Sequence, residues 1–200
     1  MSVIRFITRL HNAVFSGIER ALGGWFPGLA ARLVFASVLL LYFYNSAKTK
    51  IGDGLFGFLS VSDGAYFQIV APVVERFDFD PSRVPFLPYG LIVHLGTYSE
   101  FILPTFIVLG LFTRVAALGM VIFIAVQSYV DVTVHGLEEK SIGAMFDRFP
   151  DAVIADQRLL WAFPLVYLVV RGAGAVSLDR LLWRRSAAAL ESQMIPEAAE

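Results

Sequence analysis

The sequence predicts an all-α fold: an integral membrane four-helix bundle with an N-terminal amphipathic interfacial helix and long extracytoplasmic loops. Hydrophobic residues make up 57% of the 200-residue chain, and its mean hydropathy is +0.68. Charged residues make up only 16%, against roughly 25% in soluble domains. Four apolar stretches approach the roughly 20 residues that a helix needs to cross a bilayer. We therefore expect the lipid bilayer to surround this chain.

Composition also limits the domain organisation and the partners. Residues 1–185 are expected to form a single membrane domain, and residues 186–200 a flexible tail rich in alanine and glutamate. A formal net charge of −1 offers no basic field, so nucleic acid is not expected as a partner. The absence of cysteine excludes disulfides, thiolate metal sites and a thiol relay built from this chain's own residues.

Residues 1–24 are amphipathic. Apolar residues recur at helical spacing, and polar residues take the other positions. The apolar set is Val3, Ile7, Leu10, Val14, Ile18 and Leu22, and the polar set is Arg5, Arg9, Asn12, Ser16, Glu19 and Arg20. This pattern favours a helix in the membrane interface with its arginines among the lipid headgroups. The alternative is an amphipathic arm packed on the bundle.

Four spans are predicted, at about residues 28–47, 87–111, 114–131 and 158–175. With the N-terminus in the cytoplasm, the inner flanks hold nine of the 16 Lys and Arg residues, and the outer connections hold most of the acids. The nine are Arg5, Arg9, Arg20, Arg32, Arg114, Arg171, Arg180, Arg184 and Arg185. Because short basic flanks stay on the cytoplasmic side, both termini are expected there, in a bacterial inner membrane.

The outer connections, at about residues 48–85 and 131–156, are long. The first contains an apolar stretch, residues 65–74, which is too short to cross the bilayer. Long ordered loops in compact domains are often functional or lid-like. We expect residues 65–74 to cover the outer mouth of the bundle as a re-entrant or surface helix.

Glu100 is the strongest candidate for a functional residue. Between Arg83 and Arg114 it is the only residue with a formal charge at neutral pH. A charged side chain near the middle of a span costs at least about 2.5–3.5 kcal/mol, so it is expected to face the protein interior and to be hydrogen-bonded. By helical spacing it shares a face with Thr97 and Pro104. Glu100 and nearby His94 are the predicted proton-exchanging, catalytic residues.

Further polar and aromatic residues are expected to converge on one pocket in the outer half of the bundle, with Glu100 at its floor. Gln127, Asp131 and His135 recur at every fourth residue of span three. The predicted cofactor-binding residues are Asn45, Lys48, Tyr98, Gln127, Asp131, His135 and Trp161. The structural alternatives are that Glu100 and Gln127 only tie helices together and that Asp131 and His135 end span three in water. No metal site is predicted.

Four short motifs, in order, resemble those of the DoxX family of small four-span membrane proteins. Arg32-Leu33 opens span one and Lys48 closes it, and Glu100 stands where the family carries an acid in span two. The stretch 109–114, Leu-Gly-Leu-Phe-Thr-Arg, resembles the family's turn between spans two and three. Gly172-Ala173-Gly174 and Ser177-Leu178-Asp179 resemble its closing motif. The resemblance covers about residues 32–179.

The resemblance implies membrane redox or stress-defence chemistry. The leading hypothesis is an oxidoreductase component that binds a quinone, an apolar ring with two carbonyls to be hydrogen-bonded. A second hypothesis is a non-catalytic anchor or scaffold for a protein partner in the membrane or periplasm. A third is a small-molecule or metal transporter, for which four spans would call for a homodimer.

Overall fold

The computed structural model describes residues 2–54 and 56–183. Within them the chain is helical, with no strand and one isolated β-bridge between Ile51 and Val61. The predicted tail, residues 186–200, lies outside the described residues. Four helical segments of the described chain are long and apolar enough to cross a membrane: Phe26–Lys48, Phe86–Leu109, Thr113–Thr133 and Val153–Arg171. The prediction of an all-α chain with four membrane-length helices is confirmed.

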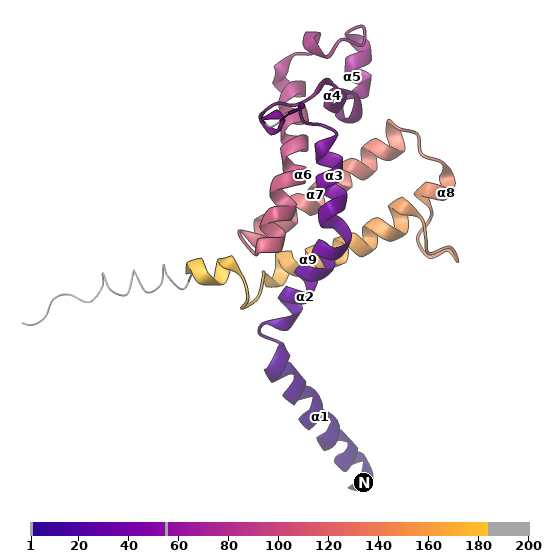
Figure 1. Ribbon diagram of the computed structural model, residues 1–200. Helices are drawn as coiled ribbons and strands as arrows, with labels where there is room; N and C mark the ends of the chain where they lie inside the picture. The colour runs from indigo at the N-terminus through magenta and orange to yellow at the C-terminus, as the bar shows by residue number, and fades with distance from the viewer. Residues whose placement is uncertain (1, 55, 184–200) are drawn as a thin grey trace, which may run out of the picture.

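Helix α1 (Ser2–Leu22) projects from the rest of the molecule (Figure 1). Its apolar side chains are exposed, from 67% at Val3 to 36% at Leu22. Such an apolar face is stable only against lipid or another protein surface. The predicted helix is therefore present, and it does not pack along the bundle.

The first membrane-length segment consists of α2 (Phe26–Phe35), the π-helical turn η1 (Ala36–Leu40) and α3 (Leu41–Lys48). The second consists of the π-helical turn η4 (Phe86–Gly90) and α6 (Leu91–Leu109). A stripe along α6 is buried, and it contains the face predicted for Glu100. The stripe is Val93, Thr97, Glu100, Pro104 and Ile107.

The other two segments are α7 (Thr113–Thr133) and α9 (Arg158–Arg171), which follows the π-helical turn η5 (Val153–Gln157). The fourth segment thus begins before the expected residue 158, because Arg158 is buried inside the protein and does not mark a polar boundary. It ends at Arg171, before the expected residue 175, because Gly172 leaves the helix with a φ of +77°. The core between these helices is apolar. Its members are Phe35, Leu39, Phe43, Ile107, Ala116, Ala117, Met120, Ile124, Leu165 and Leu168.

We call the end of the bundle with the tight 110–112 turn and residues 172–183 the turn end. Asp179 caps α7 there: its carboxylate accepts hydrogen bonds from the backbone N–H groups of Phe112 (2.6 Å) and Thr113 (3.0 Å). Arg32 donates to the carbonyl oxygens of Val108 and Val176. A Cβ at residue 110 would lie 2.8 Å from Arg32 Nη1, so glycine is required there both for space and for its φ of +69°.

The opposite end, which we call the loop end, carries two separate covers. Residues 49–85 contain η2 (Gly57–Leu59), α4 (Asp63–Ile69), α5 (Ala71–Arg76) and η3 (Pro81–Arg83), and the other loop contains α8 (Glu139–Ile142). In α4 and α5, Ala65 and Val74 are fully buried together with Val93 of α6. Figure 1 shows α4 and α5 beyond the end of α3, far from α8. Residues 65–74 thus cover α6 and not a mouth shared by all four helices.

Candidate functional site

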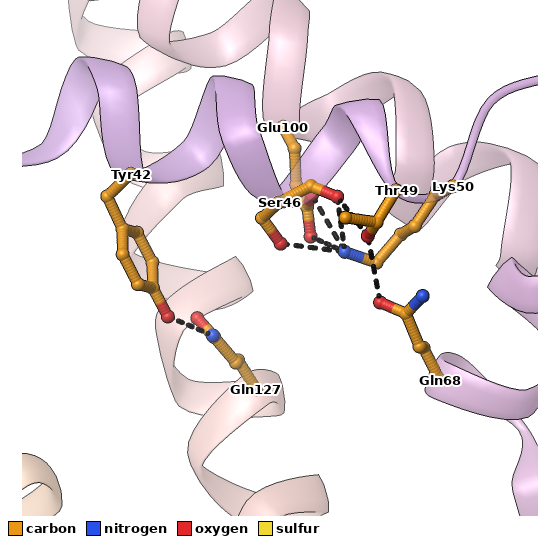
Figure 2. Close-up of polar contacts among 7 residues, drawn as sticks. All are labelled: Tyr42, Ser46, Thr49, Lys50, Gln68, Glu100 and Gln127. Carbon is orange, nitrogen blue, oxygen red and sulfur yellow. Dashed lines mark hydrogen bonds and ion pairs between the residues drawn. The ribbon is translucent and has the colours of Figure 1, made fainter.

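Glu100 forms a buried ion pair with Lys50. Lys50 Nζ lies 3.0 Å from both carboxylate oxygens of Glu100, and it also contacts Ser46 Oγ at 2.7 Å and the Ser46 carbonyl at 3.2 Å. The two charged side chains are 6% and 5% exposed. Figure 2 shows the pair between α3 and α6, with Thr49 and Gln68 beside it. The expectation that Glu100 is buried and hydrogen-bonded is confirmed, and its partner is Lys50.

The pair forms because the two helices are staggered. Lys50 stands two residues beyond the end of α3, whereas Glu100 lies near the middle of the Phe86–Leu109 segment. The half of α6 that extends past α3 is covered by α4 and α5. Thr49 Oγ1 donates to Gln68 Oε1 (3.3 Å), which joins the end of α3 to α4. The ion pair is thus enclosed where the bundle meets its cover.

A polar stripe on one face of span one leads away from the pair. Tyr42, Ser46 and Lys50 are spaced four residues apart, so they lie along one side over about 12 Å. The Tyr42 hydroxyl accepts a hydrogen bond from Gln127 Nε2 of α7 (2.9 Å). The Tyr42 and Trp161 rings are 5.4 Å apart between centroids, and Gln127 Oε1 is buried without a hydrogen-bond partner among the described residues. Figure 2 shows the Tyr42–Gln127 contact to one side of the ion pair.

A second acid–base pair joins α7 to α9. Arg158 donates to the Asp131 carboxylate through Nη2 and to Ser128 Oγ through Nη1 (2.8 Å). The Arg158 side chain is 6% exposed and that of Asp131 is 22% exposed. Gln127 and Asp131, one turn apart on α7, therefore contact different helices: Gln127 contacts α3, and Asp131 contacts α9.

His94 is not hydrogen-bonded to Glu100. Its Nδ1 lies 2.7 Å from the carbonyl oxygen of Gly90, which can only accept, so Nδ1 carries the proton. Its ring is half-buried against Phe86 (5.5 Å) and Tyr98 (6.4 Å between centroids). The two residues are six positions apart on α6, about 9 Å along the axis and on different faces.

Three of the predicted site residues are exposed: Asn45, Lys48 and His135. Within the described residues, the predicted set therefore divides into a Glu100 group, a Tyr98–His94 group, a Gln127–Trp161 group and an Asp131 group. These groups occupy different helix contacts of the loop end. No group of three His, Asp or Glu side chains suited to a metal ion occurs in the described part of the chain.

Sequence reasoning missed Lys50, Ser46 and Arg158. A signal existed for Lys50, because it continues the Tyr42–Ser46 spacing by one more turn, whereas Lys48 falls on another side of the helix. The apolar pattern of span one ends near residue 47, so it gives no reason to follow the spacing as far as Lys50. Arg158 carried a weaker signal, a base at the start of span four at the same end as Asp131.

The arrangement can hold and move a proton. Transfer from the Lys50 ammonium to the Glu100 carboxylate would break one N–H bond, form one O–H bond and leave a neutral pair. Because Tyr42 accepts from Gln127, its own hydroxyl proton is available for donation to a carbonyl. A molecule seated against Trp161 could be hydrogen-bonded by Tyr42 and also donate to Gln127 Oε1.

Two hollows are lined by other parts of the described chain. One, of about 730 Å³, lies around α8 and residues 143–152. The other, of about 910 Å³, lies at the turn end between residues 112–115 and 171–183. Neither is lined by Glu100 or Lys50.

Comparison with known proteins gives a distant relationship. A protein of Haemophilus influenzae described as uncharacterized is 29% identical over 114 residues, which are 56% of this chain and 65% of that protein. The match thus spans slightly less than two thirds of the relative. No family model matches the chain, and no solved structure matches it.

Proposed function

We propose that this chain is a DoxX-like component of membrane redox or stress-defence chemistry in which the Lys50–Glu100 pair exchanges protons with a small molecule bound in the loop-end half. The observation that supports this most is the buried ion pair itself, with both carboxylate oxygens 3.0 Å from Lys50 Nζ. Ionisable residues inside a membrane span are costly, and they commonly mark proton paths or ligand sites.

A quinone is the proposed ligand, and the contact between α3, α7 and α9 suits it. Trp161 and Tyr42 offer aromatic surface, Tyr42 can donate a hydrogen bond, and Gln127 Oε1 is an unpartnered buried acceptor. A quinone would supply two-electron chemistry that takes up two protons. The Tyr42–Ser46–Lys50 stripe offers a route between this contact and Glu100. Any thiol step would belong to a protein partner, since the chain has no cysteine.

Co-purified quinone tests this proposal. Lipid extracts of the purified full chain are analysed by ultraviolet absorbance, and we expect quinone in extracts of the wild type and of Glu100→Gln. Tyr42→Phe should lose it, because the donor is removed. Tyr44→Phe is the matched control, since the Tyr44 hydroxyl bonds to Thr105 (2.6 Å) on another face of α3. Equal quinone content in the two tyrosine variants would overturn the ligand assignment.

A second candidate function is a non-catalytic anchor for a protein partner. It is favoured by the saturation of Lys50 Nζ, which has four acceptor atoms around it from Ser46 and Glu100. A pair so closed can serve only to join α3 to α6. A Glu100→Gln protein that folds and complements a deletion strain fully would favour the anchor, and one that folds without complementing would favour proton exchange.

The same proposal places both termini in the cytoplasm of a bacterial inner membrane, with the loop end outside and α1 in the inner interface. The basic flanks of the turn end support this orientation. Because the chain has no cysteine, single cysteines at Asp151 and Ala175 report the two ends separately. An impermeant thiol reagent should label Asp151→Cys in intact cells and label Ala175→Cys only after permeabilisation. The reverse pattern would invert the topology.

A further inference from the structure

The hollow at the turn end is basic. Of the residues that line it, Arg114, Arg171 and Arg180 are cationic and Asp179 is anionic, which gives a net charge of +2. Asp179 is already occupied by the backbone N–H groups that it caps on α7. Within the described residues none of the three arginines forms an ion pair. The hollow therefore holds unneutralised guanidinium groups beside an engaged carboxylate.

Three segments distant in sequence place these arginines together. Arg114 stands in the first turn of α7, Arg171 ends α9, and Arg180 follows the Asp179 cap. Gly172 has a φ of +77°, and a Cβ there would lie 3.4 Å from Arg114 Nε, so Arg114 lies against the loop backbone. The same Asp179 contacts that close the 110–112 turn thus hold Arg180 near α7.

We propose that this hollow binds the phosphate of an anionic phospholipid headgroup. Guanidinium groups bind phosphate oxygens through paired, charge-assisted hydrogen bonds. The hollow lies at the end of α7 and α9, where membrane-length helices meet the headgroup layer. Its lining also includes apolar Val115 and the 72%-exposed Trp183, side chains suited to the upper acyl chains and the interface. Basic pockets between membrane helices are a recurrent form of anionic lipid site.

Lipid binding to the full chain in detergent, followed by native mass spectrometry, tests the proposal. The wild type should bind phosphatidylglycerol more tightly than phosphatidylcholine. Each arginine is expected to contribute about fivefold, so Arg114→Gln, Arg171→Gln and Arg180→Gln together should weaken phosphatidylglycerol binding roughly a hundredfold. The control is the loop-end triple variant Arg76→Gln, Arg83→Gln and Arg148→Gln, which removes the same charge and should bind like the wild type.

Lipid binding at this hollow differs in its outcomes from attraction by net charge and from binding of a soluble anion. Equal loss in both triple variants would mean that net charge alone attracts the lipid, and it would overturn the site. Stabilisation of the wild type by inorganic phosphate, without any by phosphatidylglycerol, would reassign the hollow to a soluble anion and overturn the lipid assignment. If the triple variant does not fold, the single variants Arg171→Gln and Arg180→Gln decide: a fivefold loss in each supports the site, and wild-type binding in both refutes it.

Discussion

The two acid–base pairs of the loop end are built alike but enclosed differently. Lys50–Glu100 joins α3 to α6, and Arg158–Asp131 joins α9 to α7. The first pair is 6% and 5% exposed beneath the cover formed by α4 and α5. In the second, Arg158 is equally buried but Asp131 is 22% exposed. The enclosure of an ion pair here therefore depends on the loop above it and not on the helices that carry it.

The difference also separates two roles of charge in a membrane protein. A closed pair has lost its hydration and depends wholly on its partner, so removal of one member strands the other. A pair open on one side keeps water or headgroups as a substitute partner. The first kind suits a controlled proton exchange or a rigid tie, and the second suits the end of a span near the polar surface.

The largest expected effect is at Glu100. Glu100→Ala leaves the Lys50 ammonium buried with only Ser46 as a partner, and we expect a loss of about 3–5 kcal/mol in the free energy of unfolding. Denaturant titration in detergent micelles measures it. Glu19→Ala on exposed α1 is the matched control and should change little. A loss at Glu100 below about 1 kcal/mol would show that the pair is hydrated in solution.

The same pair allows a sharper test of its role. Replacing both members by apolar residues, as in Lys50→Met with Glu100→Leu, removes the stranded charge, so most of the stability should return. A stable but inactive double variant would assign the charges to function. A stable and fully active one would leave them as a helix tie.

A smaller effect is expected at the open pair. Asp131→Ala should cost about 2 kcal/mol or less, because Arg158 keeps its bond to Ser128 and the site is open on the Asp131 side. The exposed Asp151→Ala is the control under the same titration. If Asp131→Ala destabilised the protein as much as Glu100→Ala, enclosure would not be what distinguishes the two pairs.

The sequence predicts the helices well because their determinants are local. Apolar length marks each span, and helical spacing correctly predicts that Thr97, Glu100 and Pro104 share a buried face. The partner of Glu100 is another matter, because it depends on where α3 ends relative to α6. That stagger results from packing between segments 50 residues apart, and no local pattern of charges encodes it.

The divergence of the helices at the loop end is equally hidden from the sequence. His94, Gln127, Asp131 and Asn45 fall at similar depths along their helices, and equal depth predicts a single outer pocket. Depth does not fix the direction in which a helix leans. Figure 1 shows α3 and α6 leading to one cover while α7 and α9 lead away to α8. Residues of equal depth therefore end in separate contacts.

The cover over the closed pair can be loosened without touching a charge. Ile69 of α4 packs on α6, where its Cδ1 would lie 3.2 Å from a Cβ at Gly96. Ile69→Val removes this methyl group, so we expect a loss of about 1 kcal/mol. The Ser62 amide, which donates to the Lys50 carbonyl (2.9 Å), should then exchange its hydrogen faster. Ile92→Val, at an exposed position of α6, is the control and should leave that exchange rate unchanged.

The smallest expected effect concerns Asp80, where the chain turns back from the cover toward α6. Asp80 Oδ1 accepts hydrogen bonds from Ser82 Oγ (2.6 Å) and from the Ser82 backbone N–H (3.0 Å). These bonds, the side-chain one first, hold the pKa of Asp80 below its ordinary value. A carboxyl group with a lowered folded-state pKa stabilises the fold above its unfolded pKa, near 3.9, and loses this contribution as pH falls through the folded value. The turn should therefore be insensitive to pH between about 5 and 8 and should weaken only in acid.

Ser82→Ala isolates the cause of this shift. It removes the side-chain hydrogen bond and keeps the backbone one, so the pKa of Asp80 should rise part of the way toward its ordinary value. NMR titration of the carboxyl carbon in aspartate-labelled protein measures it, with Asp80→Asn to assign the signal. Ser60→Ala is the control, since that hydroxyl bonds to the Gly57 carbonyl in the same loop and should leave the Asp80 titration unchanged. An unchanged pKa in Ser82→Ala would transfer the cause to Arg83, whose charge acts in the same direction. The turn would then be held by the electrostatic attraction of that side chain, and added salt would weaken it, whereas a hydrogen-bonded cap would resist salt.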